Sequence, residues 1–197
     1  MDELDLLDWK RRVFALYAAV RAEPDAARAT AGWRAGRDEL FASHPQSPLP
    51  DRAGFSGLPY FPFDPAARVT ADVGPAERRR FEVEASAGEP MAFVRFAVGR
   101  FTLGGTDCEL ELYWLDAYGG GVFVPFADAT SGAETYGAGR YLLDTVKGAD
   151  LGTEDGRLVL DFNLAYNPSC SYDPRWACPL APPANRLPLP VRAGERT

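Results

Sequence analysis

The chain has 197 residues, which is enough for one domain with a sizeable hydrophobic core. Hydrophobic residues make up 46% of the chain and charged residues 25%, and this balance excludes an intrinsically disordered protein. The formal net charge of -7 argues against a nucleic acid or an anionic membrane as partner, since both attract a basic surface.

Residues 1–10 lack the basic segment and the uninterrupted apolar segment of a secretory signal. The chain also has no apolar run of about 18 residues, the length that a membrane-spanning helix needs. Its three cysteines are too few for the disulfide framework of a small secreted protein. We therefore expect a cytoplasmic protein that forms a single domain over residues 1–197.

Two amphipathic helices are predicted within residues 1–44. Apolar residues recur three and four positions apart between Leu6 and Val20, and Pro24 is expected to end this first helix. Asp25 is a suitable cap for a second helix, which should stop before Pro45.

The hydrophobic period changes from helical to alternating near residue 66. Short β-rich runs separated by Gly, Asp and Thr follow at residues 91–98, 101–103, 109–115, 122–126, 141–143 and 158–163. Connections this short favour antiparallel neighbours, so residues 66–190 are predicted to form a β domain. The expected fold is α+β and mostly β, with two N-terminal helices packed on an antiparallel β-barrel or β-sandwich.

Several common enzyme motifs are absent from the sequence. It has no Walker-type phosphate loop, no dinucleotide-binding glycine pattern after a strand and no nucleophile elbow. The glycine run at residues 119–121 lies between two strand-like runs, which indicates a hairpin turn. The arginine run at residues 78–80 is expected on a solvated surface.

Polar residues are concentrated in several segments of the C-terminal part. These segments are Thr130-Ser-Gly-Ala-Glu-Thr-Tyr-Gly-Ala-Gly-Arg-Tyr141, Asp161-Phe-Asn163, Ala165-Tyr-Asn-Pro-Ser-Cys170, Cys178-Pro179, Asn185-Arg-Leu187 and Ala193-Gly-Glu195. With them the chain resembles a bacterial and archaeal family known as domain of unknown function 1684. The segments His44-Pro-Gln-Ser-Pro-Leu49 and Gly57-Leu58 extend the resemblance forward. That family has no established activity, so the resemblance indicates where a site lies and implies no reaction.

Glu134, Tyr136 and Arg140 are separated by even numbers of residues, so a strand would place all three on one face. Such a trio could orient a polar substrate and carry out acid–base chemistry, with Asp128 and Asp161 as further carboxylates in reach. In the alternative interpretation, Glu134 and Arg140 form a structural ion pair and Tyr136 fills the mouth of the barrel.

Residues 161–167 alternate polar and apolar side chains, which predicts a polar face that carries Asp161 and Asn163. Together with Tyr166 and Asn167, these two residues are candidates for substrate binding. The alternative is that Asn163 and Asn167 cap the backbone of the loop that follows.

His44 is the only histidine, so any imidazole chemistry must use it. It lies at the end of the second predicted helix, either as a cation favoured by the helix dipole or as a general base or ligand over the barrel mouth. Cys170 and Cys178 are expected to lie side by side as buried thiols or a disulfide, with metal ligation or a reactive thiol as alternatives.

The sequence thus predicts a domain that binds a small polar metabolite, with cofactor-free acid–base or hydrolase chemistry as the first hypothesis. The competing hypothesis is a non-catalytic ligand-binding or interaction module. No metal site, cofactor or oligomeric state is indicated. The two hypotheses differ in one observable: an enzyme should place Glu134 or Asp128 in a partly buried pocket, whereas a structural ion pair should have no adjoining cavity.

Overall fold

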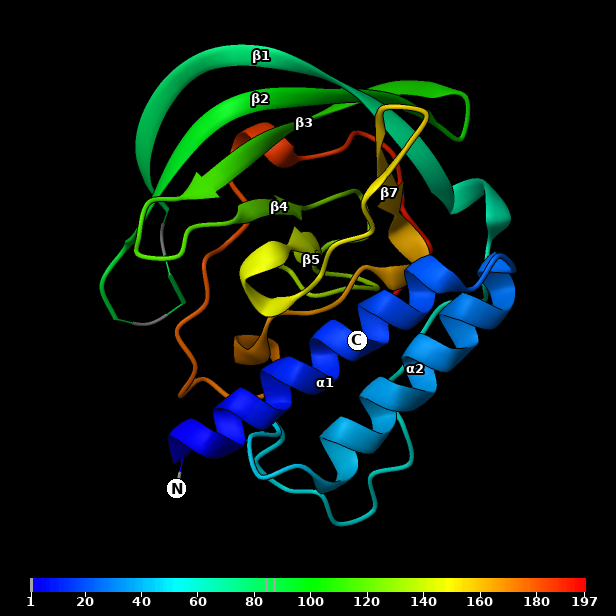
Figure 1. Cartoon of the computed structure of the whole chain (residues 1–197), viewed down its shortest axis with the longest axis vertical. Helices are drawn as coiled ribbons and strands as arrows, with labels where there is room; N and C mark the ends of the chain where they lie inside the picture. The colour runs from blue at the N-terminus through cyan, green and yellow to red at the C-terminus, as the bar shows by residue number, and fades with distance from the viewer. Residues whose placement is uncertain (1, 84, 87) are drawn as a thin grey trace.

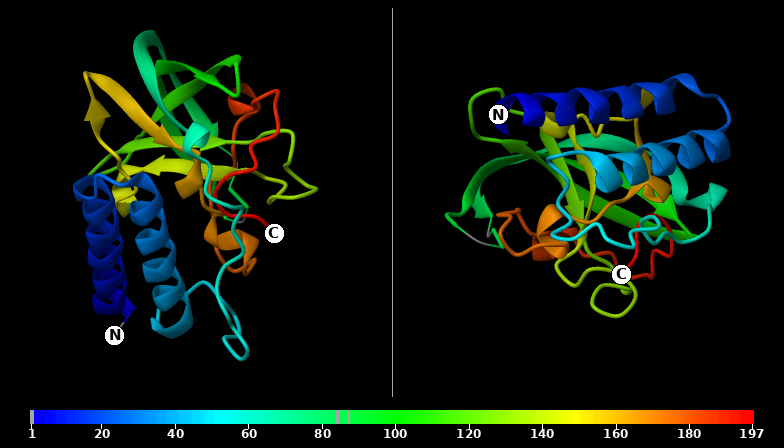
Figure 2. Two further views of the ribbon diagram at one scale, coloured as in Figure 1. Left: turned by 90° about the vertical axis from the view of Figure 1, so that its right-hand side faces the viewer. Right: turned by 90° about the horizontal axis from the view of Figure 1, so that it is seen from below.

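Two α-helices, α1 (Asp2–Ala22) and α2 (Ala26–Ser43), begin the chain and run side by side (Figures 1 and 2). This computed structural model describes residues 2–83, 85–86 and 88–197. The chain reverses between the helices at Pro24, and the Asp25 carboxylate accepts hydrogen bonds from the first turn of α2 at 3.0 Å. Both predicted helices and the predicted cap are confirmed.

Seven strands form a sheet of order β5-β4-β3-β2-β1-β7-β6, in which each strand is antiparallel to its neighbours. The strands are β1 (Arg68–Val83), β2 (Met91–Leu103), β3 (Thr106–Leu115), β4 (Val122–Phe126), β5 (Arg140–Asp144), β6 (Thr153–Glu154) and β7 (Arg157–Asp161). Short 3-10 helices are η1 (Pro65–Ala67), η2 (Thr145–Lys147), η3 (Phe162–Leu164), η4 (Ser169–Ser171) and η5 (Pro183–Asn185). The predicted antiparallel, mostly β fold with two N-terminal helices packed against it is confirmed, as a curled half-barrel.

The curl comes from the three long strands β1, β2 and β3, which arch over the shorter strands and the C-terminal segment (Figure 1). The β1–β2 pairing shifts register between Pro75 and Arg79, and the β2–β3 pairing shifts between Arg95 and Ala97. Extra residues of this kind bend a strand and increase its twist. The two bulges therefore give the arch its concave side.

The main hydrophobic core is formed by side chains of strands β2, β3, β4, β5 and β7 and of the C-terminal segment. Leu110, Phe126 and Phe162 are among its most buried members. The helices pack on a second cluster through Tyr17 and Trp33, which lie against Val159 and Leu164.

The apolar stripe predicted on α1 is only partly buried. Leu6, Leu7 and Phe14 remain 43%, 41% and 48% exposed, because α1 packs through Val13, Leu16, Tyr17 and Val20 instead. Among the described residues, no helix combines the length and apolarity that a membrane span requires.

Candidate functional site

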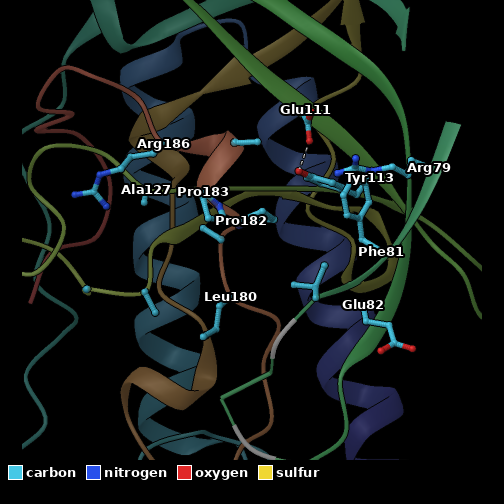
Figure 3. A pocket seen from close by; sticks show the side chains of 15 residues that line it. Arg79, Phe81, Glu82, Glu111, Tyr113, Ala127, Leu180, Pro182, Pro183 and Arg186 are labelled. Carbon is cyan, nitrogen blue, oxygen red and sulfur yellow. Dashed lines mark hydrogen bonds between the residues drawn. The ribbon is translucent and has the colours of Figure 1, made fainter. Parts of the chain in front are cut away.

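A pocket of about 680 Å³ lies between the arch of β1 and β3 and a C-terminal segment of residues 179–186, which we call the strap (Figure 3). Its volume falls within the range of about 300–1,000 Å³ that is typical of small-molecule sites. The residues that line it are Arg79, Phe81, Glu82, Val83, Glu111, Tyr113, Ala127, Gly137, Ala138, Leu180, Ala181, Pro182, Pro183, Ala184 and Arg186. Most are apolar, and the charged ones come from the two strands and the end of the strap.

Hydrogen bonds hold the strap near both ends, to the sheet at Asn185 and to the segment after β1 at Cys178, the residue before the strap. The fully buried Asn185 side chain donates hydrogen bonds to the carbonyls of Glu111 at 3.0 Å and Pro125 at 2.7 Å, and it accepts one from the Glu111 backbone at 2.8 Å. At the other end, the backbone N–H of Ser86 donates to the carbonyl of Cys178 at 2.9 Å. The pocket wall opposite the sheet is therefore fixed by hydrogen bonds.

Two polar side chains on the sheet side of the pocket, Glu111 and Tyr113, are linked by hydrogen bonds to each other and to Arg95 outside the lining. Glu111 and Tyr113 are two residues apart in β3, so they share a face, and the Tyr113 hydroxyl donates to Glu111 at 2.6 Å. The other Glu111 oxygen accepts a hydrogen bond from Arg95 at 2.7 Å. Burial, followed by the bond to Glu111, raises the pKa of Tyr113 well above its usual range. The phenol consequently stays protonated, and both oxygens of Glu111 are engaged.

Two further arginines, Arg79 and Arg186, line the pocket from opposite walls. Within the described part of the chain, neither has a carboxylate within 4.0 Å. The Arg79 guanidinium lies 4.2 Å from the ring centroid of Phe81, and its side chain extends toward Tyr113 (Figure 3). Arg186 points away from the centre of the pocket in the same view. Arg79 is therefore the cation that faces the pocket.

Asp128 and Arg140, two of the predicted catalytic residues, form a closed ion pair away from this pocket. Their side chains are 0% and 1% exposed, and the atoms Asp128 Oδ2 and Arg140 Nη2 are 2.9 Å apart. Arg140 also donates to the backbone carbonyls of Val191, Ala193 and Glu195. Burial lowers the pKa of Arg140, and Asp128 opposes that shift. Neither residue lines the pocket between the arch and the strap.

The strand predicted through Glu134, Tyr136 and Arg140 is wrong. Only Arg140 belongs to a strand, β5, while residues 131–139 form turns. Gly132 and Gly139 have φ values of 89° and 93°, which end the extended conformation on both sides of the turn. Even spacing therefore does not place these three side chains on one face.

The side chains of this segment point to different surroundings. Glu134 forms an ion pair with Arg192 at 2.9 Å on the surface, and the hydrogen bond from Arg192 lowers the pKa of Glu134. The Tyr136 hydroxyl is 3.7 Å from the Cys170 sulfur, and burial raises the pKa of Tyr136 to about 12. The ion pair considered between Glu134 and Arg140 does not form, because Arg140 pairs with Asp128.

The alternation predicted through Asp161 and Asn163 also ends early. Strand β7 stops at Asp161, whose side chain caps η3 by accepting the Asn163 backbone N–H at 2.9 Å. The Asn163 amide exchanges hydrogen bonds of 2.7 and 2.9 Å with the backbone of Asp64. Asn163 therefore binds backbone groups, as the alternative interpretation expected, but those groups belong to Asp64 and not to the loop that follows residue 167.

Asp161 lines a second pocket, of about 440 Å³, between the α1–α2 turn and β7. Burial raises the pKa of Asp161, although hydrogen bonds from Asn163 oppose the shift. Arg68, which also lines this pocket, already pairs with Glu154 and lies 4.0 Å from Asp161. Arg68 is therefore already engaged by the two carboxylates, Glu154 and Asp161, that line the second pocket beside it.

Asn167 contacts a buried glutamate, Glu195, which the sequence did not single out as a site residue. The Tyr166 ring lies against Arg37, with 5.1 Å between the guanidinium carbon and the ring centroid. The Asn167 backbone and Arg37 of α2 donate to Glu195 at 3.0 and 2.7 Å, and the Tyr172 hydroxyl donates to its second oxygen. Burial raises the pKa of Glu195 to about 7, and Arg37 opposes the shift. This cluster joins the C-terminal segment to α2, and it does not line the first pocket.

His44 caps the C-terminus of α2 and is buried. Its Nε2 atom is 3.2 Å from Asp8 of α1, and its Nδ1 atom accepts a hydrogen bond from the Gln46 backbone. The imidazole thus links the two helices, and it is not over the mouth of the first pocket.

Cys170 and Cys178 are free and buried, and the loop between them folds back on itself. The Cys170 backbone N–H donates to the Cys178 sulfur at 3.4 Å, and burial raises the pKa of Cys178 to about 11. In the described ranges, no three His, Cys, Asp or Glu side chains gather as metal ligands would.

The pocket residues were not predicted, although two signals in the sequence pointed to them. The alternation over residues 109–115 places Glu111 and Tyr113 on one face, and this pattern had been used only to predict a strand. Arg79 belongs to the arginine run at 78–80, for which a solvated surface was predicted.

Two comparisons relate the chain to known proteins. A family model described as protein of unknown function (DUF1684) matches residues 53–196. The chain is similar to the solution NMR structure of an uncharacterized protein from Haloarcula marismortui, with 38% identity and a TM-score of 0.62, over 83% of this chain and 90% of that one. No curated protein matches the chain.

Proposed function

The chain belongs to the DUF1684 family of proteins of unknown function, and we propose that it is a binding protein for a small, partly apolar molecule. The ligand occupies the pocket between the β1–β3 arch and the strap. Because the family description names no activity, the proposal depends on the geometry of this pocket.

The observation that carries the proposal is the combination of an apolar lining with a fixed polar pair. Phe81, Val83 and Leu180 offer apolar surface, while Tyr113 and Glu111 are held in place by their mutual hydrogen bond. Small-molecule sites have this composition, because apolar contacts supply affinity and a few placed polar groups set the orientation. Asn185 keeps the opposite wall in position without a ligand, which reduces the entropic cost of binding.

Binding without catalysis is favoured over acid–base chemistry. A general base must reach the proton that it removes, and the Glu111 carboxylate is turned toward Tyr113 and Arg95, with a short hydrogen bond on each oxygen. Tyr113 keeps its proton because its pKa is raised. Asp128 and Glu134, the carboxylates favoured by the sequence for catalysis, do not line the pocket.

A fragment screen followed by NMR chemical-shift mapping tests the proposal. Bound fragments are expected to shift resonances of residues 79–83, 111–113 and 180–186. Ala127→Leu places a larger side chain at a buried wall position and should weaken binding at least about tenfold, or by about 1.4 kcal/mol. Ala129→Leu is the matched control, because Ala129 is exposed and outside the pocket. Fragments that shift other surfaces, or bind equally to Ala127→Leu that is shown to be folded, would refute the proposal.

A further inference from the structure

The charges beside the pocket do not balance. Arg79 of β1 lies directly opposite Arg95 of β2 in the antiparallel pairing. Like charges at such paired positions repel each other. Arg95 is neutralised by Glu111, but within the described residues no carboxylate lies within 4.0 Å of Arg79. Arg186 also lines the pocket without a carboxylate partner among the described residues, but it points away from the centre of the pocket (Figure 3). Arg79 is therefore the unpaired positive charge that faces the pocket, on a chain whose formal net charge is -7.

The Arg79 guanidinium is held in a defined orientation. It stacks at 4.2 Å over the centroid of Phe81, which also lines the pocket, and it extends toward Tyr113 (Figure 3). A stacked guanidinium keeps its N–H groups free at the edge of its plane, where they match the two oxygens of a carboxylate. Two acidic residues line the pocket among the described residues, Glu82 and Glu111, and Glu111 already binds Arg95. Glu82 is exposed and points away from Tyr113 in the view of Figure 3.

We propose that the ligand of the pocket is a small organic monocarboxylate, whose carboxylate binds Arg79 and whose apolar body lies against Phe81, Val83 and Leu180. This inference rests on the proposed function, because it specifies the ligand class of the same pocket. A single negative charge matches the single unpaired guanidinium that faces the pocket. The bound carboxylate also relieves the repulsion between Arg79 and Arg95.

Pairs of molecules that differ only in charge test the inference. The probes are phenylacetate with phenylacetamide and hexanoate with hexanamide, each titrated into the full chain and followed by NMR at residues 79–83 and 111–113. The carboxylate of each pair is expected to bind at least about tenfold more tightly than its amide, and added salt should reduce this ratio.

Two neighbouring substitutions separate a specific contact from general charge. Arg79→Gln should bring the affinity ratio of acid to amide close to one. Arg78→Gln removes the same charge from an exposed neighbour that does not line the pocket, and it should leave most of the ratio in place. Both positions are exposed, so both variants should fold, and thermal melts check this.

Each outcome has a separate meaning. Equal binding of acids and amides in the pocket of the wild type would overturn the inference and leave the proposed function standing. An acid preference that survives Arg79→Gln would also overturn the inference, because Arg79 would not be the contact. If no probe shifts the pocket resonances, and the fragment screen also finds no ligand there, both proposals fail.

Discussion

Arg140→Met tests whether the buried pair of Asp128 and Arg140 stabilises the fold or serves the pocket. The substitution removes the guanidinium from Asp128 and leaves the carbonyls of Val191, Ala193 and Glu195 without their donor. Breaking a buried ion pair on one side costs about 3–5 kcal/mol, because a charge stays buried without a partner. For a chain of this size, that loss lowers the Tm by roughly 6–20 °C.

The assay combines thermal and urea unfolding with a ligand titration at a temperature where the variant is folded. Since Asp128 and Arg140 do not line the pocket, the folded variant should bind carboxylate probes as the wild type does. The double variant Asp128→Asn/Arg140→Met should recover part of the lost stability, because no unpaired carboxylate then remains buried. A Tm within about 2 °C of wild type, or a folded Arg140→Met that no longer binds the probes, would refute a structural role.

Three other perturbations test contacts outside this pair. Burial raises the pKa of Glu195 from 4.5 to about 7, so its contribution to stability is complete below pH 4.5 and is lost as the pH rises through about 7. This decline amounts to about 3 kcal/mol, and Glu195→Gln should remove it. Urea unfolding of the wild type and of Glu195→Gln at pH 5 and pH 8 measures the effect. An equal loss of stability in the two proteins would contradict the reasoning. Asn185→Ala should lower the free energy of unfolding, measured with urea, by about 2–4 kcal/mol, because two carbonyls and one N–H lose their partner. An unchanged urea midpoint would mean that other contacts hold the strap. Gly194→Ala should lower the Tm more than Gly54→Ala. The two glycines share a φ near 75°, but only at Gly194 would a Cβ meet backbone oxygens, at 2.6 Å. Equal melting temperatures of the two variants would speak against this.

The boundaries of the helices could be predicted because their causes are local. Pro24 cannot continue α1, and the Asp25 carboxylate binds N–H groups two and three residues away. Strands β2 to β5 and β7 were also accessible from the alternating pattern, and their antiparallel order from the short connections, whereas β1 and β6 lie outside the predicted runs. Sequence alone also indicated the family, which the match over residues 53–196 confirms.

The candidate site could not be predicted, because its contacts join distant parts of the chain. Arg79 meets Arg95 only through a β1–β2 register that includes a bulge, and no local pattern specifies where the bulge occurs. Asn185 reaches Glu111 across a sequence separation of 74 residues.

The sequence by itself determined the helices, the strand character and the acidic balance of this protein, since each depends on composition or on neighbours within a few residues. The tertiary structure decided which charges are satisfied. Asp128 rather than Glu134 became the partner of Arg140, because turns separate Glu134 from β5 and direct it to Arg192 at the surface. An ion pair depends on distance and burial, and packing sets both only when the whole chain has folded.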